Sequence, residues 1–487
     1  MKKVFNSWIV ILLVLSLAFT GCYKDLGNYD YEEPNAISFS NINDAYVAIL
    51  GDSLVIKPKL TFTTDVSNDT SNYSYEWLAL RTDGVLPADV KKELGKTKNL
   101  VTTVTIPPGP YKVYYRVTDK KTGIQFQTTC KLTVQSSVYE GWMVMCDVNG
   151  KARVDMLSKI TDTSYRLLVD VLKFTGSNIP EKYLGAPVQI NCYAYDPTMY
   201  GIYISTSGGT TKIHPETFVW DPTYDLKYEF VGNVSNGFVA DNMTNLSGNR
   251  AYAHGNDGHV YYYYRVLSIR YSTPINLVKG ELKSFNAFKL VAANSTNAIL
   301  YDNDNKRFVR HINNEATTTL MPAGTLFNYD KVGSTMKYMA YSNYNSGNVF
   351  AIMKNDTTSK MMLARIGFAA NINQLYYAPL TGTDIDNANL FAIDPVFGYV
   401  YYAVGGKLYS YDFNLKASKL MVDYGSREIS LLDFSRGTLN VFSYSPAEPA
   451  TSGKLECFTT AAVQGNFVKA NTYAGFGKAV SASYRVR

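Results

Sequence analysis

Histidine is the side chain best suited to acid–base or metal chemistry, and this 487-residue sequence contains four: His214, His254, His259 and His311. His254 and His259 flank a Gly-Asn-Asp-Gly turn, so a hairpin could bring them and Asp257 together around a metal ion. Against this, the spacing matches no helical His-x-x-x-His site, and exposed histidines are common in turns. We therefore expect no metal site here.

Carboxylates offer a second route to chemistry. The segment Asp-Asn-Asp-Asn at 302–305 resembles the start of a calcium loop, but it lacks the downstream glycine and bidentate glutamate of an EF-hand. An acidic hairpin turn is the better interpretation. The sequence has no G-x-S-x-G elbow, P-loop or dinucleotide fingerprint, so we assign no catalytic residue and no cofactor. A pair of carboxylates from distant strands would leave no local signature, so a polysaccharide hydrolase or lyase is kept as an alternative.

Aromatic residues give the remaining signal, because the chain has 40 tyrosines. Most should fill the spaces between sheets, with their hydroxyl groups reaching water or loop carbonyls. The segment FVWDPTYDLKY is, however, a candidate aromatic platform, since flat rings stack on sugars or on peptide side chains. The carboxylates in the segment would accept hydroxyl or amide hydrogens. The ligand-binding candidates are Trp220, Asp221, Tyr224 and Asp225.

The elements that must position these residues are β-strands throughout. Residues 37–136 alternate short apolar and polar runs with turn residues between them, and Trp77 lies near the middle. About seven short strands in about 100 residues with a central buried tryptophan predict an immunoglobulin-like β-sandwich.

Residues 139–487 continue the β pattern with a long-range repeat. Turns rich in Asn, Asp, Gly or Pro recur about every 43 to 60 residues, close to the length of a propeller blade. They lie at 149–150, 196–197, 256–258, 302–303, 345–347, 394–395 and 445–446. Two copies are alike, YAYDPTMYGIYI (193–204) and FAIDPVFGYVYY (391–402), about four blades apart. We therefore predict a β-propeller of seven blades, with six or eight as alternatives, closed when the alternating segment 480–487 joins the first blade.

Charge and cysteine content exclude several classes of protein. The formal net charge of +6 is mild and no Lys/Arg cluster occurs, which argues against nucleic-acid binding. Cys130, Cys146, Cys192 and Cys457 match no CxxC spacing, and buried thiols are the simpler interpretation. A disulfide between Cys146 and Cys192 is left open.

The N-terminus predicts export. Two lysines precede an apolar run that is too short to cross a bilayer, and Thr20-Gly21-Cys22 follows it. This arrangement resembles a bacterial lipobox. We therefore expect a signal peptide at 1–21, lipid attachment at Cys22 and a polar tether over 22–36.

The order of several short motifs resembles the PKD-like lipoproteins of Bacteroidota. These motifs are CYKDLGNYDYEEPNAI (22–37), Gly51-Asp52, Tyr75-Glu76-Trp77, Leu94-Gly95, Asn99-Leu100, Pro108-Gly109-Pro110-Tyr111, Val117-Thr118-Asp119 and Glu140-Gly141-Trp142. The Lys24-Asp25 pair after the cysteine also resembles the signal that sends such lipoproteins to the outer face of the outer membrane. The resemblance implies a cell-surface protein encoded beside SusC/SusD-like importers, and it implies no catalytic residues.

Three functions follow as hypotheses. The first is a non-catalytic, lipid-anchored outer-membrane protein that binds nutrient oligomers (glycan or peptide) or docks on a SusC/SusD-like complex. The second is the propeller-based hydrolase or lyase. The third is a structural or adhesive module whose rim binds another protein.

Overall fold

The alternating residues of the first region form strands in the computed structural model, which describes residues 35–67, 69–84, 91–194, 200–235, 237–246, 249–368 and 371–486. The chain divides into two compact units, Met1–Gln135 and Ser136–Arg487. The strands of the first unit are β1 (Ile37–Ser40), β2 (Ala45–Ile49), β3 (Ser53–Ile56), β4 (Lys59–Phe62), β5 (Tyr73–Arg81), β6 (Lys91–Gly95), β7 (Leu100–Thr103), β8 (Gly109–Asp119) and β9 (Gln125–Gln135).

The first unit is the predicted immunoglobulin-like sandwich. One sheet has the order β2-β9-β8-β5-β6, and the pairs β1-β4 and β3-β7 complete the unit. Trp77 is fully buried in the core and stacks on Tyr115, with ring centroids 4.0 Å apart. Its indole N–H donates to the Thr97 carbonyl at 3.0 Å, which satisfies the one polar group that the ring buries.

The second unit is also built from strands. They are β10 (Gly141–Val148), β11 (Lys151–Lys159), β12 (Tyr165–Leu168), β13 (Pro187–Ala194), β14 (Tyr200–Thr206), β15 (Gly209–Ile213), β16 (Ala240–Leu246), β17 (Arg250–Gly255), β18 (Val260–Tyr264), β19 (Ala292–Ala293), β20 (Asn297–Asp302), β21 (Arg307–Ile312), β22 (Thr319–Leu320), β23 (Ser334–Ser342), β24 (Asn348–Asn355), β25 (Met361–Phe368), β26 (Ile372–Pro379), β27 (Leu390–Ile393), β28 (Val400–Val404), β29 (Lys407–Asp412), β30 (Ala417–Asp423), β31 (Glu428–Ser435), β32 (Thr438–Tyr444), β33 (Gly453–Thr459), β34 (Val468–Phe476) and β35 (Lys478–Arg485).

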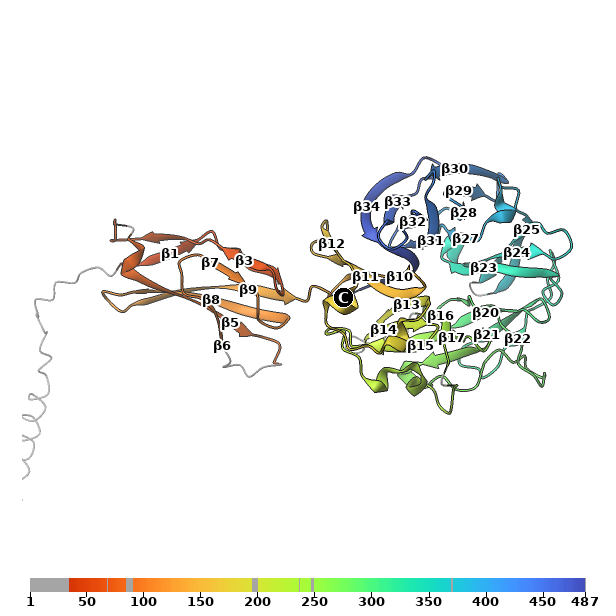
Figure 1. Cartoon of the computed structure of the whole chain (residues 1–487), viewed down its shortest axis with the longest axis horizontal. Coiled ribbons are helices and arrows are strands. Elements are labelled where there is room, and N and C mark those ends of the chain that lie inside the picture. The colour runs from red at the N-terminus through yellow and green to blue at the C-terminus, as the bar shows by residue number, and fades with distance from the viewer. Residues whose placement is uncertain are drawn as a thin grey trace, which may run out of the picture. The chain divides into compact units, whose positions relative to one another are not determined.

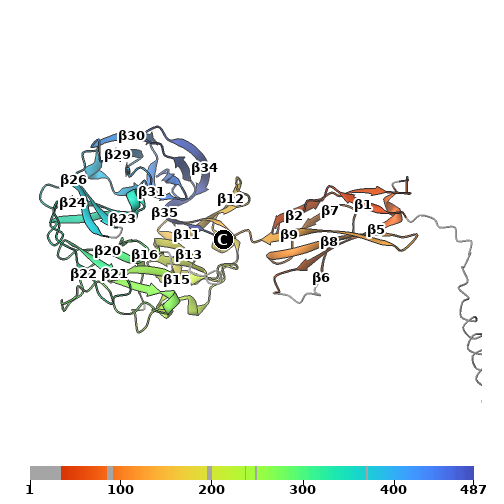
Figure 2. The same cartoon turned by 180° about the vertical axis from the view of Figure 1, so that it is seen from behind.

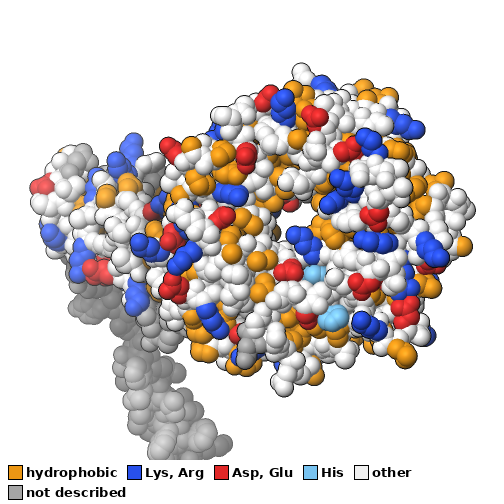
Figure 3. Space-filling model, turned by 45° about the vertical axis from the view of Figure 1, so that its right-hand side comes forward, with side chains coloured by type: hydrophobic (Ala, Val, Ile, Leu, Met, Phe, Trp, Pro, Cys, Tyr) orange, Lys and Arg blue, Asp and Glu red, His pale blue; other side chains and the backbone are white. Residues whose placement is uncertain are grey.

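These strands form a β-propeller. Within the described residues they make seven sheets, with the orders β12-β11-β10-β35, β13-β14-β15, β16-β17-β18, β19-β20-β21-β22, β23-β24-β25-β26, β27-β28-β29-β30 and β31-β32-β33-β34. The sheets follow one another around a ring in Figure 1 and Figure 2. Figure 3 shows an opening at the centre of this ring. The all-β prediction is confirmed.

The last strand closes the ring, as predicted from the alternating C-terminal segment. β35 pairs antiparallel with β10, from Gly141 opposite Arg485 to Asp147 opposite Lys478. The Gly477 N–H also donates to the buried Asp155 carboxylate at 3.2 Å, which ties the C-terminal segment to β11. Closure leaves each sheet covered by a neighbour on both faces, which is how propellers bury their apolar side chains.

The regular turns that revealed the repeat are of two kinds. Four of them (149–150, 256–258, 302–303 and 445–446) join the second and third strands of a sheet, counted outward from the centre. Two, 345–347 and 394–395, join the first and second strands, and 196–197 lies outside the described residues. Each of the described turns therefore belongs to a different sheet, and the two kinds of turn lie at opposite ends of the propeller. The like segments at 193–204 and 391–402 are β13–β14 and β27–β28, four sheets apart, as expected.

Helix is scarce in the described part of the chain: α2 (Val171–Phe174) is a single turn, and no helix there is long and apolar enough to span a membrane. The predicted signal peptide at 1–21, the lipid-attachment residue Cys22 and most of the tether lie outside the described residues.

Candidate functional site

A pocket of about 520 Å³ lies where the innermost strands of three neighbouring sheets end, and we call it the strand-end pocket. β16 ends at Leu246, β19 at Ala293 and β23 at Ser342. The residues lining the pocket are Asn245, Leu246, Ala293, Asn294, Ser295, Tyr341, Asn343, Ser346 and Phe368.

Two asparagines of this pocket are held by the neighbouring backbone and side chains. The amides of Asn245 and Asn191 exchange two hydrogen bonds, of 2.7 and 2.9 Å, across the innermost strands β16 and β13. Asn294 donates to the Phe368 carbonyl at 3.2 Å, while its side-chain oxygen accepts from the backbone N–H groups that follow it. These amides therefore form a fixed wall of the pocket.

Tyr341 lies on the wall contributed by β23. Its ring meets Phe368 edge-on, with centroids 6.2 Å apart. The ring also lies against Gly347, where an added Cβ would lie 2.7 Å from Tyr341 Oη. Gly347 has a φ of 111°, a conformation that other residues rarely adopt. Glycine is therefore required here for the turn and for the close contact with the Tyr341 ring.

Several polar groups of the pocket have no hydrogen-bond partner among the described residues. Within the described residues, the Tyr341 hydroxyl and the side chains of Asn343, Ser346 and Ser295 make no hydrogen bond to the protein. Amides and hydroxyls both donate and accept hydrogen bonds, as do the hydroxyl groups of a sugar. The arrangement can therefore receive a neutral, hydroxyl-rich ligand.

The described lining of the pocket carries no charged side chain. Of the described residues that line it, none is Asp, Glu, His, Lys, Arg or Cys. General acid–base chemistry requires a titratable group within hydrogen-bond reach of the reacting atom. Tyr341 is the titratable side chain of the described lining, and the other polar groups can only donate or accept hydrogen bonds.

The predicted platform around Trp220 lies elsewhere, in the segment that follows β15. The Trp220 indole N–H donates to Thr211 Oγ1 at 2.9 Å, and its backbone exchanges hydrogen bonds with the Asn178 side chain. Tyr183 lies beside the indole, with ring centroids 6.0 Å apart. The side chain is thus half-buried and engaged in packing.

The carboxylates of this segment are also engaged. Asp221 accepts from the Thr223 hydroxyl at 2.6 Å and from the Thr223 N–H at 2.8 Å; these bonds, the hydroxyl first, lower its pKa. Asp225 accepts from the Tyr183 hydroxyl at 2.7 Å and from the Lys227 N–H at 3.0 Å. Tyr224 is half-buried near the Lys212 ammonium. The structure brings the four candidates together, and their polar groups mainly hold the segment in place.

The histidine hairpin holds no metal cluster. His254 is buried; its Nε2 lies 3.0 Å from the Ala287 carbonyl, and burial lowers its pKa. His259 instead faces Asn276, and Asp257 accepts from the Tyr261 hydroxyl. Within the described residues, no group of three or more His, Cys, Asp or Glu could bind a metal ion.

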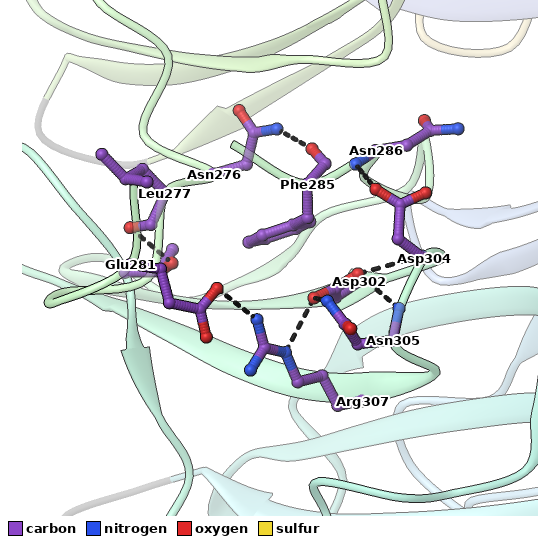
Figure 4. A network of polar contacts seen from close by, with 10 residues as sticks. Asn276, Leu277, Glu281, Phe285, Asn286, Asp302, Asp304, Asn305 and Arg307 are labelled. Carbon is purple, nitrogen blue, oxygen red and sulfur yellow. Dashed lines mark hydrogen bonds and ion pairs between the residues drawn. The ribbon is translucent and has the colours of Figure 1, made fainter. Parts of the chain in front are cut away.

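The acidic segment at 302–305 is the hairpin turn that we expected (Figure 4). Asp302 accepts from the backbone N–H groups of Asp304 and Asn305, at 3.0 and 2.9 Å. Its other oxygen accepts from Arg307 at 2.7 Å, and Arg307 also pairs with Glu281. Figure 4 shows these groups directed toward one another, so the carboxylate closes a turn.

The cysteines resolve the question left open by their spacing. Cys146 is a buried thiol whose Sγ lies 3.3 Å from Asp155 Oδ2, and it forms no disulfide with Cys192. Burial raises the pKa of Cys130 and of Cys457, each to about 11, so both remain protonated thiols at neutral pH.

Sequence reasoning missed the strand-end pocket. Tyr341 and Asn343 have no motif around them, and Asn245 lies in an ordinary alternating strand. One signal was present, because the Asn345-Ser346-Gly347 turn borders the pocket. A turn that joins the innermost strand to the next must lie near the centre of the ring, and that position was not evident before the fold.

Comparison with known proteins gives a match to one family model and a set of similar structures. The sequence matches the PKD-like family model over residues 22–182, about a third of the chain. No curated protein sequence matches. Among solved structures, a quinonprotein alcohol dehydrogenase-like protein from Bacteroides thetaiotaomicron is 11% identical, with a TM-score of 0.44, and the match covers 91% of this chain and 96% of that one.

Two further structures are similar. The extracellular domain of a candidate one-component system from B. thetaiotaomicron is 12% identical, with a TM-score of 0.39 and coverage of 89% of this chain and 67% of that chain. BamB from Moraxella catarrhalis is 8% identical, with a TM-score of 0.34 and coverage of 69% of this chain and 89% of that chain.

Proposed function

We propose that this protein is a non-catalytic binding protein for glycan oligomers, whose neutral sugar units it recognises at the strand-end pocket. The observation that carries the proposal is that Tyr341, Asn343 and Ser346 make no hydrogen bond to the described protein, in a hollow lined by no charged side chain. A sugar ring can stack on or lie beside Tyr341 while its hydroxyl groups bond to the amides and hydroxyls around it.

We further propose that the protein acts at the cell surface, anchored to the outer membrane by lipid on Cys22. The lipobox-like sequence supports this, and so does the start of the family match at residue 22. Docking on a SusC/SusD-like importer is the partner that the family resemblance favours. The anchor is tested by growing cells with a labelled fatty acid: label on the wild-type chain and none on Cys22→Ser would support it.

The glycan proposal is tested with an array of neutral oligosaccharides, followed by calorimetric titration of the best ligand. Tyr341→Ala should weaken binding about tenfold, which corresponds to about 1.4 kcal/mol. Tyr224→Ala, another half-buried tyrosine, is the matched control and should leave the affinity unchanged. Binding of peptides instead of glycans, or equal effects of the two substitutions, would contradict the proposal.

The hydrolase or lyase alternative predicts product formation from the bound oligomer, and the adhesive alternative predicts a protein ligand at the rim. The pocket lining supports neither. Chromatography of the oligomer after long incubation with the protein distinguishes binding from turnover.

A further inference from the structure

A second hollow, of about 280 Å³, lies between the last sheet of the propeller and the first, and we call it the Arg436 groove. Its lining residues are Trp142, Asp162, Thr163, Tyr165, Arg436, Thr438, Asn440, Cys457, Asn471, Tyr473 and Tyr484. Arg436 follows the innermost strand β31, and Tyr484 lies near the end of the innermost strand β35. The groove therefore lies at the same end of the innermost strands as the strand-end pocket.

Arg436 occupies an unusual backbone position. It forms a two-residue turn with Gly437, closed by the pair Ser435 and Thr438, and both turn residues have positive φ (55° and 78°). Such turns favour Asn-Gly, because asparagine tolerates the left-handed region better than most residues that carry a Cβ atom. The turn thus carries an arginine where asparagine would be easier to accommodate.

The Arg436 guanidinium stacks on Tyr484. Its Cζ lies 3.7 Å from the centre of the ring. Tyr484 is held in turn, because its hydroxyl donates to Glu140 at 2.8 Å and its ring meets Trp142 edge-on. Stacking of this kind fixes the plane of a guanidinium and leaves its N–H edge available.

Arg436 has no ion-pair partner in the part of the chain that the structure describes. Among these residues, no carboxylate lies within ion-pair distance of it, whereas Arg153, Arg265 and Arg307 each have an acidic partner at 3.0 Å or less. The acids nearby are otherwise engaged, since Asp162 and Glu140 both pair with Lys159.

The partly buried Asp433 near the groove is held by hydrogen bonds from its neighbours. It accepts from the Ser435 hydroxyl and from the Asn440 amide, and burial raises its pKa. The groove therefore presents a guanidinium group that makes no ion pair within the described residues.

The other residues that line the groove provide aromatic and neutral polar groups that can contact a sugar ring. Tyr165 and Tyr473 meet edge-on, with centroids 5.5 Å apart, and both are only half-buried. Thr163 and Asn471 are exposed beside them and offer hydroxyl and amide groups. An arginine edge beside aromatic and neutral polar groups matches a sugar residue that carries a carboxylate, because guanidinium and carboxylate form two parallel hydrogen bonds.

We propose that the Arg436 groove binds a uronic-acid residue, with Arg436 contacting its carboxylate, so that the glycan recognised by this protein is an acidic polysaccharide. This inference rests on the proposed function, and it adds the class of the glycan. The strand-end pocket would then contact neutral parts of such a polymer.

The test uses the purified full chain, a tetragalacturonate and the same oligomer with its carboxylates reduced to alcohols. Wild-type protein should bind the acidic oligomer at least about tenfold more tightly than the reduced one. Arg436→Asn should abolish this preference, and it should fold normally because asparagine suits the turn. Arg270→Asn removes an exposed arginine elsewhere and is the matched control.

The outcomes separate the two proposals. If the acidic and reduced oligomers bind wild-type protein equally, or if Arg436→Asn keeps the preference, the groove is not a carboxylate site, although glycan binding through Tyr341 still stands. If neither oligomer binds and the neutral array is blank, the proposed function itself fails, and the inference fails with it. Competition by inorganic sulfate with no preference for uronate would also overturn the inference.

Discussion

The Trp220 segment and the strand-end pocket both combine aromatic with polar side chains but use them differently. Each combines aromatic rings with polar side chains beside a strand end. In the Trp220 segment, the indole N–H and both carboxylates already bond to the protein. In the pocket, Tyr341, Asn343 and Ser346 make no such bonds within the described residues.

The difference shows that composition alone does not define a binding site. A polar group contributes to ligand recognition when the fold leaves its hydrogen-bonding capacity unused, because a bond that replaces an existing one brings little net gain. We therefore expect substitutions in the Trp220 segment to change stability and substitutions around the pocket to change affinity.

The largest effect should come from Trp220→Ala. Loss of a half-buried indole and its hydrogen bond should reduce the free energy of unfolding by about 2–3 kcal/mol. Glycan affinity, measured below the denaturation midpoint, should not change. Denaturant unfolding followed by tyrosine fluorescence gives the first quantity and calorimetry the second. A large loss of affinity with unchanged stability would reverse our assignment of the two regions.

Gly347→Ala tests whether the position of Tyr341, which the backbone at Gly347 allows, determines binding in the pocket. The new methyl group would meet Tyr341 Oη, and alanine is strained at a φ of 111°. We expect a loss of about 1–2 kcal/mol in stability and a severalfold weaker affinity, because Tyr341 must move. Gly150→Ala, at a φ of 79° with open space around it, controls for backbone strain alone. It should cost stability without weakening binding; if it weakens binding equally, Tyr341 is not the cause.

Asp221→Ala should have a smaller effect on stability alone. Asp221 caps the 3-10 turn Pro222–Tyr224 by accepting from the Thr223 N–H, and losing such a cap lowers the free energy of unfolding. Thermal denaturation measures the loss, and Asp221→Asn, which preserves the cap, should recover most of it. Loss of glycan binding in both variants would revive the platform hypothesis for this segment.

The smallest effect concerns pH. Burial lowers the pKa of His254 and of His311, so the folded state favours their neutral forms. Their contribution to stability is therefore present above the unfolded value of about 6.5 and is lost as the pH falls through the folded pKa. The free energy of unfolding should decrease from pH 7 to pH 5. Affinity for a neutral glycan should stay constant over this range, and a parallel fall would place a titrating group in the site.

The sequence predicted much of the second unit, for reasons visible in particular segments. The like segments at 193–204 and 391–402 occupy equivalent strand pairs, because Tyr203 and Tyr401 are both buried on the second strand of a sheet. The closing role of 480–487 followed from local alternation. The kind of each turn did not follow, because Asn, Asp, Gly and Pro favour hairpins at either end of a sheet.

By itself, the sequence determined that the chain forms two β units, where their strands lie and which segment closes the ring, because alternation and turn chemistry are encoded within a few residues. Only the tertiary structure decided which polar groups form hydrogen bonds within the protein. Asn178 binds the Trp220 backbone, Tyr183 binds Asp225 and Asn191 binds Asn245, all across more than 40 residues of sequence. Hydrogen bonds between such distant positions depend on how the sheets meet, and no local pattern records them.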